Sequence, residues 1–182
     1  MNNTNQKQLS QVNIMENIMI NDLYKFKLIH GTKNPACKWK DKKNHFKKTP
    51  TFNYGIPTGI VNNIFVLDLD FYKLDIDEIL TNPFIQLYGE HPEFDTFTVS
   101  SPSGGLHYYF IFDEELSQNT CNKKLEIDTR SNGGYIVGPG SQTVSKVTGI
   151  VDEYKTINDT NINPIPDDLK TWMLENLYSK TK

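Results

Sequence analysis

Cysteine is scarce in this sequence, and the two that occur, Cys37 and Cys121, lie far apart. Neither has a second cysteine nearby, so we expect neither a disulfide framework nor a zinc site. Long apolar runs are also missing, because no stretch approaches the ~20 residues that a membrane-spanning helix needs. The N-terminus lacks the basic and apolar pattern of a signal peptide. We therefore expect a soluble, intracellular protein without a membrane partner.

An overall excess of basic residues is absent too. The formal net charge of −3 argues against a uniformly basic nucleic-acid coat. The lysines are distributed unevenly, however, because six of them share one short stretch with a single acid, Asp41. They are Lys38, Lys40, Lys42, Lys43, Lys47 and Lys48. Such a cluster is suited to a phosphate backbone, although a solvated lysine-rich loop has the same pattern.

The remaining composition is that of a globular domain. The 182 residues are 37% hydrophobic and 12% aromatic, which is enough to build a buried core. Residues 1–10 are polar and are expected to form a disordered tail. We expect residues 11–182 to fold as a single domain.

Hydrophobic periodicity predicts the order of the elements. The pattern predicts a helix over 12–23, an extended segment over 24–29, a buried strand over 64–70, a helical segment over 74–88 that Pro83 interrupts, strands over 96–99 and 106–112 joined by a tight loop, a hairpin-like unit over 125–129 and 135–137, and a last helix from Pro166. Strands come in a run, with helices mainly at the ends. This order favours an α+β fold over a series of βαβ units.

Two carboxylates come at the end of the predicted strand over 64–70. Asp68 and Asp70 are two residues apart, so their side chains share one face of a strand. Adjacent carboxylates repel one another, and a divalent cation such as Mg²⁺ relieves this repulsion. Two exposed acids at a strand end are the simpler alternative. A two-metal nucleotidyltransferase and an Asp-x-Asp glycosyltransferase both fit, whereas Tyr72 stands where a haloacid-dehalogenase phosphatase needs Thr or Val.

A third acid is offered by a later strand. Alternation places Asp128 and Arg130 on one face and Ile127 on the core side. A carboxylate beside a guanidinium suits a place where a metal and a triphosphate meet, because arginine binds phosphate oxygens through two parallel hydrogen bonds. A surface ion pair on an edge strand would give the same local pattern.

Glycine-rich turns precede two of the predicted strands. His107 follows the run Ser103-Gly104-Gly105-Leu106, and an imidazole beside such a turn can bind a phosphate that the turn's backbone N–H groups also contact. A core histidine with satisfied hydrogen bonds is the alternative. The run from Tyr54 to Gly59 can likewise bring the backbone close to a ligand, or it can be an ordinary turn.

Six short motifs occur together in one order. They are Gly31-x-Lys33-x-Pro35 with Trp39, Asn53 to Gly59, Val66 to Asp70, Ser101 to Phe110, Ile127 to Arg130, and Gly133 to Ser141. Their order closely resembles the primase-polymerase domain of the archaeo-eukaryotic primase superfamily, as found at the N-terminus of viral and plasmid primase-helicases. The resemblance covers residues 25–178. One departure is Gly138-Pro139-Gly140-Ser141, which stands where the family usually has Ala-Pro-Pro-Ser.

The resemblance implies a fold and a site. The fold is a β-sheet module related to the RNA-recognition motif, packed with a second α/β unit. Asp68, Asp70 and Asp128 would hold two catalytic Mg²⁺ or Mn²⁺ ions, and His107 would act with them. The implied contacts of the nucleotide are His107, Arg130, Ser103, Gly105, Gly55 and Thr58.

We therefore predict a DNA primase/polymerase domain. It would join NTPs or dNTPs on a single-stranded DNA template during replication, with the lysines at 38–48 contacting the template, and a helicase domain is expected in the full-length chain. One alternative is a non-catalytic nucleic-acid-binding module that positions a helicase, which the three acids argue against. Another is a metal-dependent glycosyltransferase, which leaves His107 and Arg130 without a role.

Overall fold

The computed structural model describes residues 17–179, and its centre is a six-stranded antiparallel sheet. This large sheet has the order β11-β4-β5-β3-β7-β6. Its strands are β3 (Ile64–Leu69), β4 (Thr98–Ser100), β5 (Leu106–Ile111), β6 (Thr120–Asn122), β7 (Ile127–Arg130) and β11 (Lys155–Asn158). A small sheet contains β1 (Phe26–Lys27), β2 (Tyr54–Pro57) and β8 (Tyr135–Val137), and a separate ribbon pairs β9 (Gln142–Val144) with β10 (Val151–Glu153).

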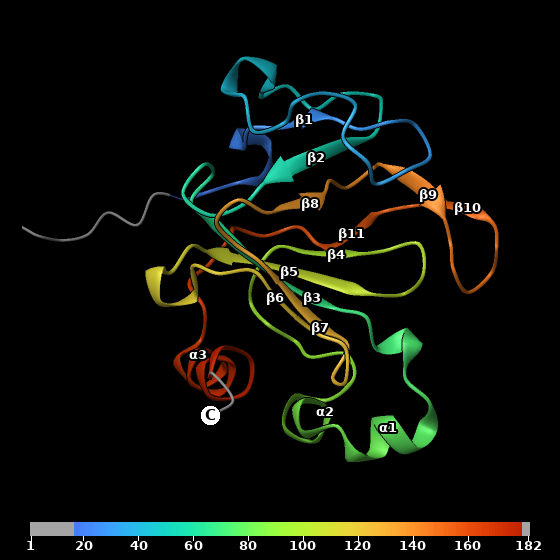
Figure 1. Ribbon diagram of the computed structural model, residues 1–182, viewed down its shortest axis with the longest axis vertical. Coiled ribbons are helices and arrows are strands. Elements are labelled where there is room, and N and C mark those ends of the chain that lie inside the picture. Colours follow the sequence, from blue (N-terminus) through green and yellow to red (C-terminus); the bar gives the residue numbers. More distant parts are fainter. Residues whose placement is uncertain (1–16, 180–182) are drawn as a thin grey trace, which may run out of the picture.

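The helices are short. They are α1 (Ile76–Thr81), α2 (Pro83–Tyr88), α3 (Asp167–Met173) and a π-helical turn η5 (Leu174–Tyr178), with 3-10 turns η1 (Ile20–Asp22), η2 (Lys42–Asn44), η3 (Phe71–Lys73) and η4 (Glu114–Leu116). Figure 1 shows α1, α2 and α3 below the large sheet and the small sheet above it. Across residues 17–179, no helix is long and apolar enough to span a membrane.

Strand β3 is buried on both faces. Its residues Phe65 and Leu67 belong to a core shared with Phe84 and Trp172 of the helices, whereas Val66 belongs to a second core beneath the small sheet. Because side chains alternate along a strand, Asp68 faces the same side as Val66. The antiparallel sheets and the helices confirm the α+β class.

The unit around the small sheet is built from strands and loops. Among its described residues the helical elements are the 3-10 turns η1 and η2, where the family resemblance implied an α/β unit. The fully buried Lys25 ties this unit together, because its ammonium donates to four backbone carbonyls. The acceptors are Ile20 O, Asn21 O, Leu23 O and Lys47 O, at 3.2, 3.3, 3.0 and 2.9 Å.

Several predicted elements are confirmed. The strand predicted over 64–70 is β3, and the strands around 96–112 are the antiparallel pair β4 and β5. Pro83 separates α1 from α2 and occupies the first turn of α2, where its missing N–H costs nothing. The last helix begins at Asp167, although Pro166 at its N-cap makes no side-chain hydrogen bond.

Two predictions are wrong in the described residues. In the described part of the helix expected over 12–23, which is residues 17–23, the helical structure is the single turn η1, because Ile18 pairs with Ile162 and Leu23 is buried in the second core. Residues 1–16, including the predicted tail over 1–10, lie outside the described residues. The predicted hairpin over 125–137 is wrong because β7 pairs with β3 and β6, whereas β8 pairs with β2. The turn at 131–134 therefore carries the chain from one sheet to the other.

Candidate active site

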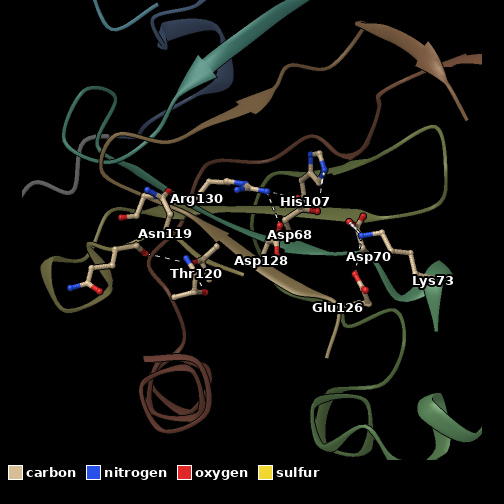
Figure 2. A network of polar contacts seen from close by, with 12 residues as sticks. Asp68, Asp70, Lys73, His107, Asn119, Thr120, Glu126, Asp128 and Arg130 are labelled. Atoms are coloured by element: carbon tan, nitrogen blue, oxygen red, sulfur yellow. Dashed lines mark hydrogen bonds and ion pairs between the residues drawn. The ribbon is translucent and has the colours of Figure 1, made fainter. Parts of the chain in front are cut away.

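Three candidate residues meet because their strands pair in register. Asp68 of β3 lies directly opposite His107 of β5 on one side and Asp128 of β7 on the other. Directly opposed residues of an antiparallel pair project on the same face. His107 Nε2 lies 3.3 Å from Asp68 Oδ1, and the Arg130 guanidinium donates to Asp128 Oδ2 at 2.7 Å (Figure 2). The same guanidinium is 4.0 Å from Asp68 Oδ2.

Asp68 is a buried acid in a positive environment, with 8% of its surface exposed. Burial alone would raise the pKa of Asp68, but the neighbouring His107, Arg130 and Lys33 outweigh that effect and lower it. The carboxyl group is therefore ionised. Its contact with His107 is an ion-pair contact, and within the described chain neither Asp68 Oδ1 nor His107 Nδ1 has a hydrogen-bond partner. Buried polar atoms without a hydrogen-bond partner indicate that a polar ligand binds beside them.

Asp70 lies just beyond the end of β3 and is engaged elsewhere. Its Oδ2 is 2.5 Å from the Lys73 ammonium, which is also 2.8 Å from Glu126 Oε2 (Figure 2). Burial and the nearby charge of Asp68 raise the pKa of Asp70, against the opposing effect of Lys73. A Cβ atom added to Gly105 would lie 2.7 Å from Asp70 Oδ1. Glycine at 105 therefore allows its loop to pass close to this acid.

The predicted metal ligands do not form a complete protein cage. Within residues 17–179, no group of three or more His, Cys, Asp or Glu side chains is placed to hold a metal ion. Magnesium does not require one, since it is usually bound by one or two carboxylates together with waters and substrate phosphates. The opposed carboxylates of Asp68 and Asp128, with Asp68 Oδ1 lacking a hydrogen bond, fit a hard divalent cation.

A cavity of about 420 Å³ opens beside these residues, within the size range of small-ligand sites. Asp68, His107 and Arg130 line it from the large sheet. The other unit contributes Lys33, Trp39, Tyr135, Ile136 and Val137, and the remaining lining residues are Asn119, Gly133, Gly134 and Tyr154. Trp39 and Tyr135 contact edge to face, with centroids 5.1 Å apart. The cavity thus has a charged side on the large sheet and, on the other unit, a side where two aromatic rings accompany Lys33.

Four predicted nucleotide contacts do not line this cavity, and one of them is Gly105, which lies next to Asp70. Gly55 packs under Phe26, where an added Cβ atom would lie 2.3 Å from the ring. Thr58 is buried and donates to Ser131 O at 2.6 Å. Ser103 accepts a hydrogen bond from Lys146 N at 2.9 Å. Thr58 and Ser103 therefore hold loops near the site.

The lysine-rich stretch forms an exposed loop beside the small sheet, and all six predicted template lysines are exposed. Lys40 and Lys42 border a smaller cavity of about 100 Å³ together with His45. This cavity shares Trp39, Gly133 and Gly134 with the larger one. The positive loop therefore adjoins the candidate site.

The sequence pattern predicts no role for some of the residues at the site. Lys33 and Trp39 belong to the first motif, so that motif was the available signal. Asn119 precedes β6, which was not predicted, and Tyr154 follows β10, also not predicted. Asn119 is structurally important because its Oδ1 accepts from Ser131 N at 2.7 Å and its Nδ2 donates to Asn132 O at 2.8 Å.

Comparison with known families identifies the family of this chain. Residues 22–168 match Prim-Pol, described as the N-terminal domain of bifunctional DNA primase/polymerase. The chain belongs to the Prim-Pol family. The matched range contains Asp68, His107, Asp128 and Arg130, and it confirms the family resemblance of the ordered motifs. A search among curated proteins gave no match. Family membership indicates a DNA primase/polymerase that acts with nucleotides and nucleic acid.

Proposed function

We propose that this Prim-Pol domain catalyses metal-dependent nucleotidyl transfer on a single-stranded DNA template during replication. The observation that carries the proposal is the position of Asp68, an ionised acid opposed by His107 and Asp128 with one oxygen free of hydrogen bonds. Nucleotidyl transfer requires carboxylates that can bind a divalent cation and polar groups that can bind phosphate. Asp68, a carboxylate, and His107, a candidate phosphate contact, line the same cavity.

Asp68 and Asp128 would hold Mg²⁺ or Mn²⁺, and Asp70 would be the third acid. When bound, the metal supplies positive charge that stabilises the attacking and leaving oxygens of the displacement. Asp70 meets Lys73 in the described arrangement, so its part as a ligand requires this ion pair to loosen. Arg130 holds Asp128 in place through its 2.7 Å contact.

The nucleotide would lie along the cavity with its phosphates at the charged side. His107 Nδ1 is a buried group that can hydrogen-bond to a phosphate oxygen, and the Trp39 and Tyr135 rings offer an apolar wall for the base. The exposed lysines at 38–48 would contact the template backbone. We further propose that the large sheet, with its helices on one face, is the module related to the RNA-recognition motif, and that a helicase is the functional partner.

Nucleotide incorporation on a single-stranded DNA template with Mg²⁺ or Mn²⁺ tests this function, with and without a primer. We expect wild-type protein to incorporate nucleotides and Asp68→Asn to reduce incorporation to background. Asp152→Asn is the matched control, because Asp152 is a half-exposed acid on the ribbon, 2.9 Å from Lys155. An inactive wild type that still binds DNA would support a non-catalytic module. Full activity in Asp68→Asn would contradict the proposed site.

A further inference from the structure

The two cations that line the cavity are not equivalent. Arg130 is the single arginine in the sequence, and the sequence pattern made it the natural phosphate contact. Its guanidinium is already 2.7 Å from one carboxylate, Asp128, and 4.0 Å from a second, Asp68. A phosphate approaching Arg130 would have to compete with both acids. Arg130 is therefore better placed to organise the carboxylates than to bind the ligand.

Lys33 is in the opposite situation. It lines the same cavity, and among the residues that the structure describes it makes no ion pair with a carboxylate. Its backbone is fixed because Tyr135 donates a hydrogen bond from its hydroxyl to Lys33 O at 3.0 Å. A fixed backbone and an ammonium without an acidic partner leave this charge available for an anion.

A buried hydroxyl lies beside Lys33. The Lys33 ammonium is 5.8 Å from the ring centroid of Tyr154, whose side chain lies 5.5 Å from His107 between ring centroids. Tyr154 is 1% exposed and lines the cavity, yet its hydroxyl finds no hydrogen-bond partner within residues 17–179. Leaving such a group unpaired costs free energy. With His107 Nδ1, it makes two buried polar atoms at one cavity that need a ligand.

We propose that Lys33, rather than Arg130, is the main cation that binds the triphosphate of the incoming nucleotide, with the Tyr154 hydroxyl donating to the same ligand. This inference rests on the proposed function. Lys33 comes from the small-sheet unit, whereas the carboxylates come from the large sheet. The nucleotide would thus connect the two units.

Binding of a non-hydrolysable nucleoside triphosphate in the presence of Ca²⁺, measured by calorimetry, tests this assignment without requiring turnover. We expect Lys33→Met to weaken triphosphate binding by about 10-fold to 100-fold, as for the loss of a charge-assisted hydrogen bond. Lys33→Arg should restore most of the affinity, and Tyr154→Phe should lose a smaller part. Lys124→Met is the matched control, since Lys124 is exposed and lies outside the cavity lining. In nucleotide incorporation, Lys33→Met should raise KM more than it lowers kcat.

Wild-type triphosphate affinity in Lys33→Met would overturn the assignment. If the same variant also lost single-stranded DNA binding, measured by fluorescence anisotropy, Lys33 would be a template contact instead. Failure of the proposed function looks different, since the wild-type protein itself would then neither bind the triphosphate nor incorporate nucleotides.

Discussion

Replacing Gly134 by alanine should disrupt the turn that joins the two sheets. A Cβ atom at this position would lie 2.3 Å from Asn119 Oδ1 and 3.0 Å from Thr58 Oγ1. The Asn119 amide cannot move freely, because its Oδ1 accepts from Ser131 N at 2.7 Å and its Nδ2 donates to Asn132 O at 2.8 Å. The added methyl group must therefore displace an amide that holds the turn by both of its polar atoms.

The expected size follows from those two hydrogen bonds. Each is worth about 0.5–1.5 kcal/mol, so Gly134→Ala should lower the free energy of unfolding by about 1–3 kcal/mol. Asn119→Ala should cost a similar amount, because it removes the same two bonds. In the double variant the methyl group no longer meets the amide, so the second substitution should add little. The double variant should therefore retain about 1–3 kcal/mol more stability than the sum of the single effects predicts.

Equilibrium unfolding in urea measures these free energies. Gly133→Ala is the matched control, because Gly133 has φ of +71° and no atom within 4 Å of an added Cβ. Its cost is backbone strain of about 1–2 kcal/mol, and this cost should simply add to that of Asn119→Ala. If the Gly134→Ala and Asn119→Ala effects also add, the contact between these two residues does not control the turn and the reasoning is refuted.

Two further predictions concern groups around the site. Lys73→Met should lower the Mg²⁺ concentration that gives half-maximal incorporation, because the ammonium 2.5 Å from Asp70 Oδ2 would no longer compete with the metal for this acid. An unchanged Mg²⁺ concentration at half-maximal incorporation would show that Asp70 is not a metal ligand. Burial raises the pKa of Tyr178 to about 12, although its hydrogen bond with Thr129 acts in the opposite direction. Because the unfolded chain loses this proton nearer pH 10, stability should fall between pH 10 and 12. In Tyr178→Phe, the melting temperature should fall less between pH 10 and 12 than it does in the wild-type protein. An equal fall in both proteins would show that Tyr178 is not the group responsible.

The acid cluster was partly predictable because it depends on local alternation. The run from Ile64 to Leu69 is apolar enough to be a central strand, and a period of two residues placed Asp68 on one face. The same argument placed Asp128 and Arg130 together, and they are 2.7 Å apart. The alternation of side chains along a strand does not predict which strands pair. The pairing of β3 with both β5 and β7 brings Asp128 opposite Asp68. The ordered motifs indicated that meeting only through family resemblance.

The error at 125–137 has a physical cause. The run Ser131-Asn132-Gly133-Gly134 has the composition of a hairpin turn, and both flanking segments are strands. Contacts far away in the sequence decide the outcome, because Thr58 donates to Ser131 O at 2.6 Å and Asn132 Oδ1 accepts from Ile60 N at 3.0 Å. These bonds draw the turn toward β2. Lys33 and Tyr154 were similarly without a predicted role, because a single loop residue carries no periodic signal.

The two sides of the cavity are built with different rigidity, and this difference bears on how the site would work. Asp68, His107 and Asp128 lie on three neighbouring strands of one sheet, which fixes their separations more firmly than loops do. Lys33 lies outside the regular strands, and its long side chain is exposed. A metal site needs fixed carboxylates, whereas a flexible ammonium can follow a triphosphate as pyrophosphate departs. The division between rigid acids and an adjustable cation therefore suits a reaction in which Asp68 and Asp128 stay in place while the phosphates move.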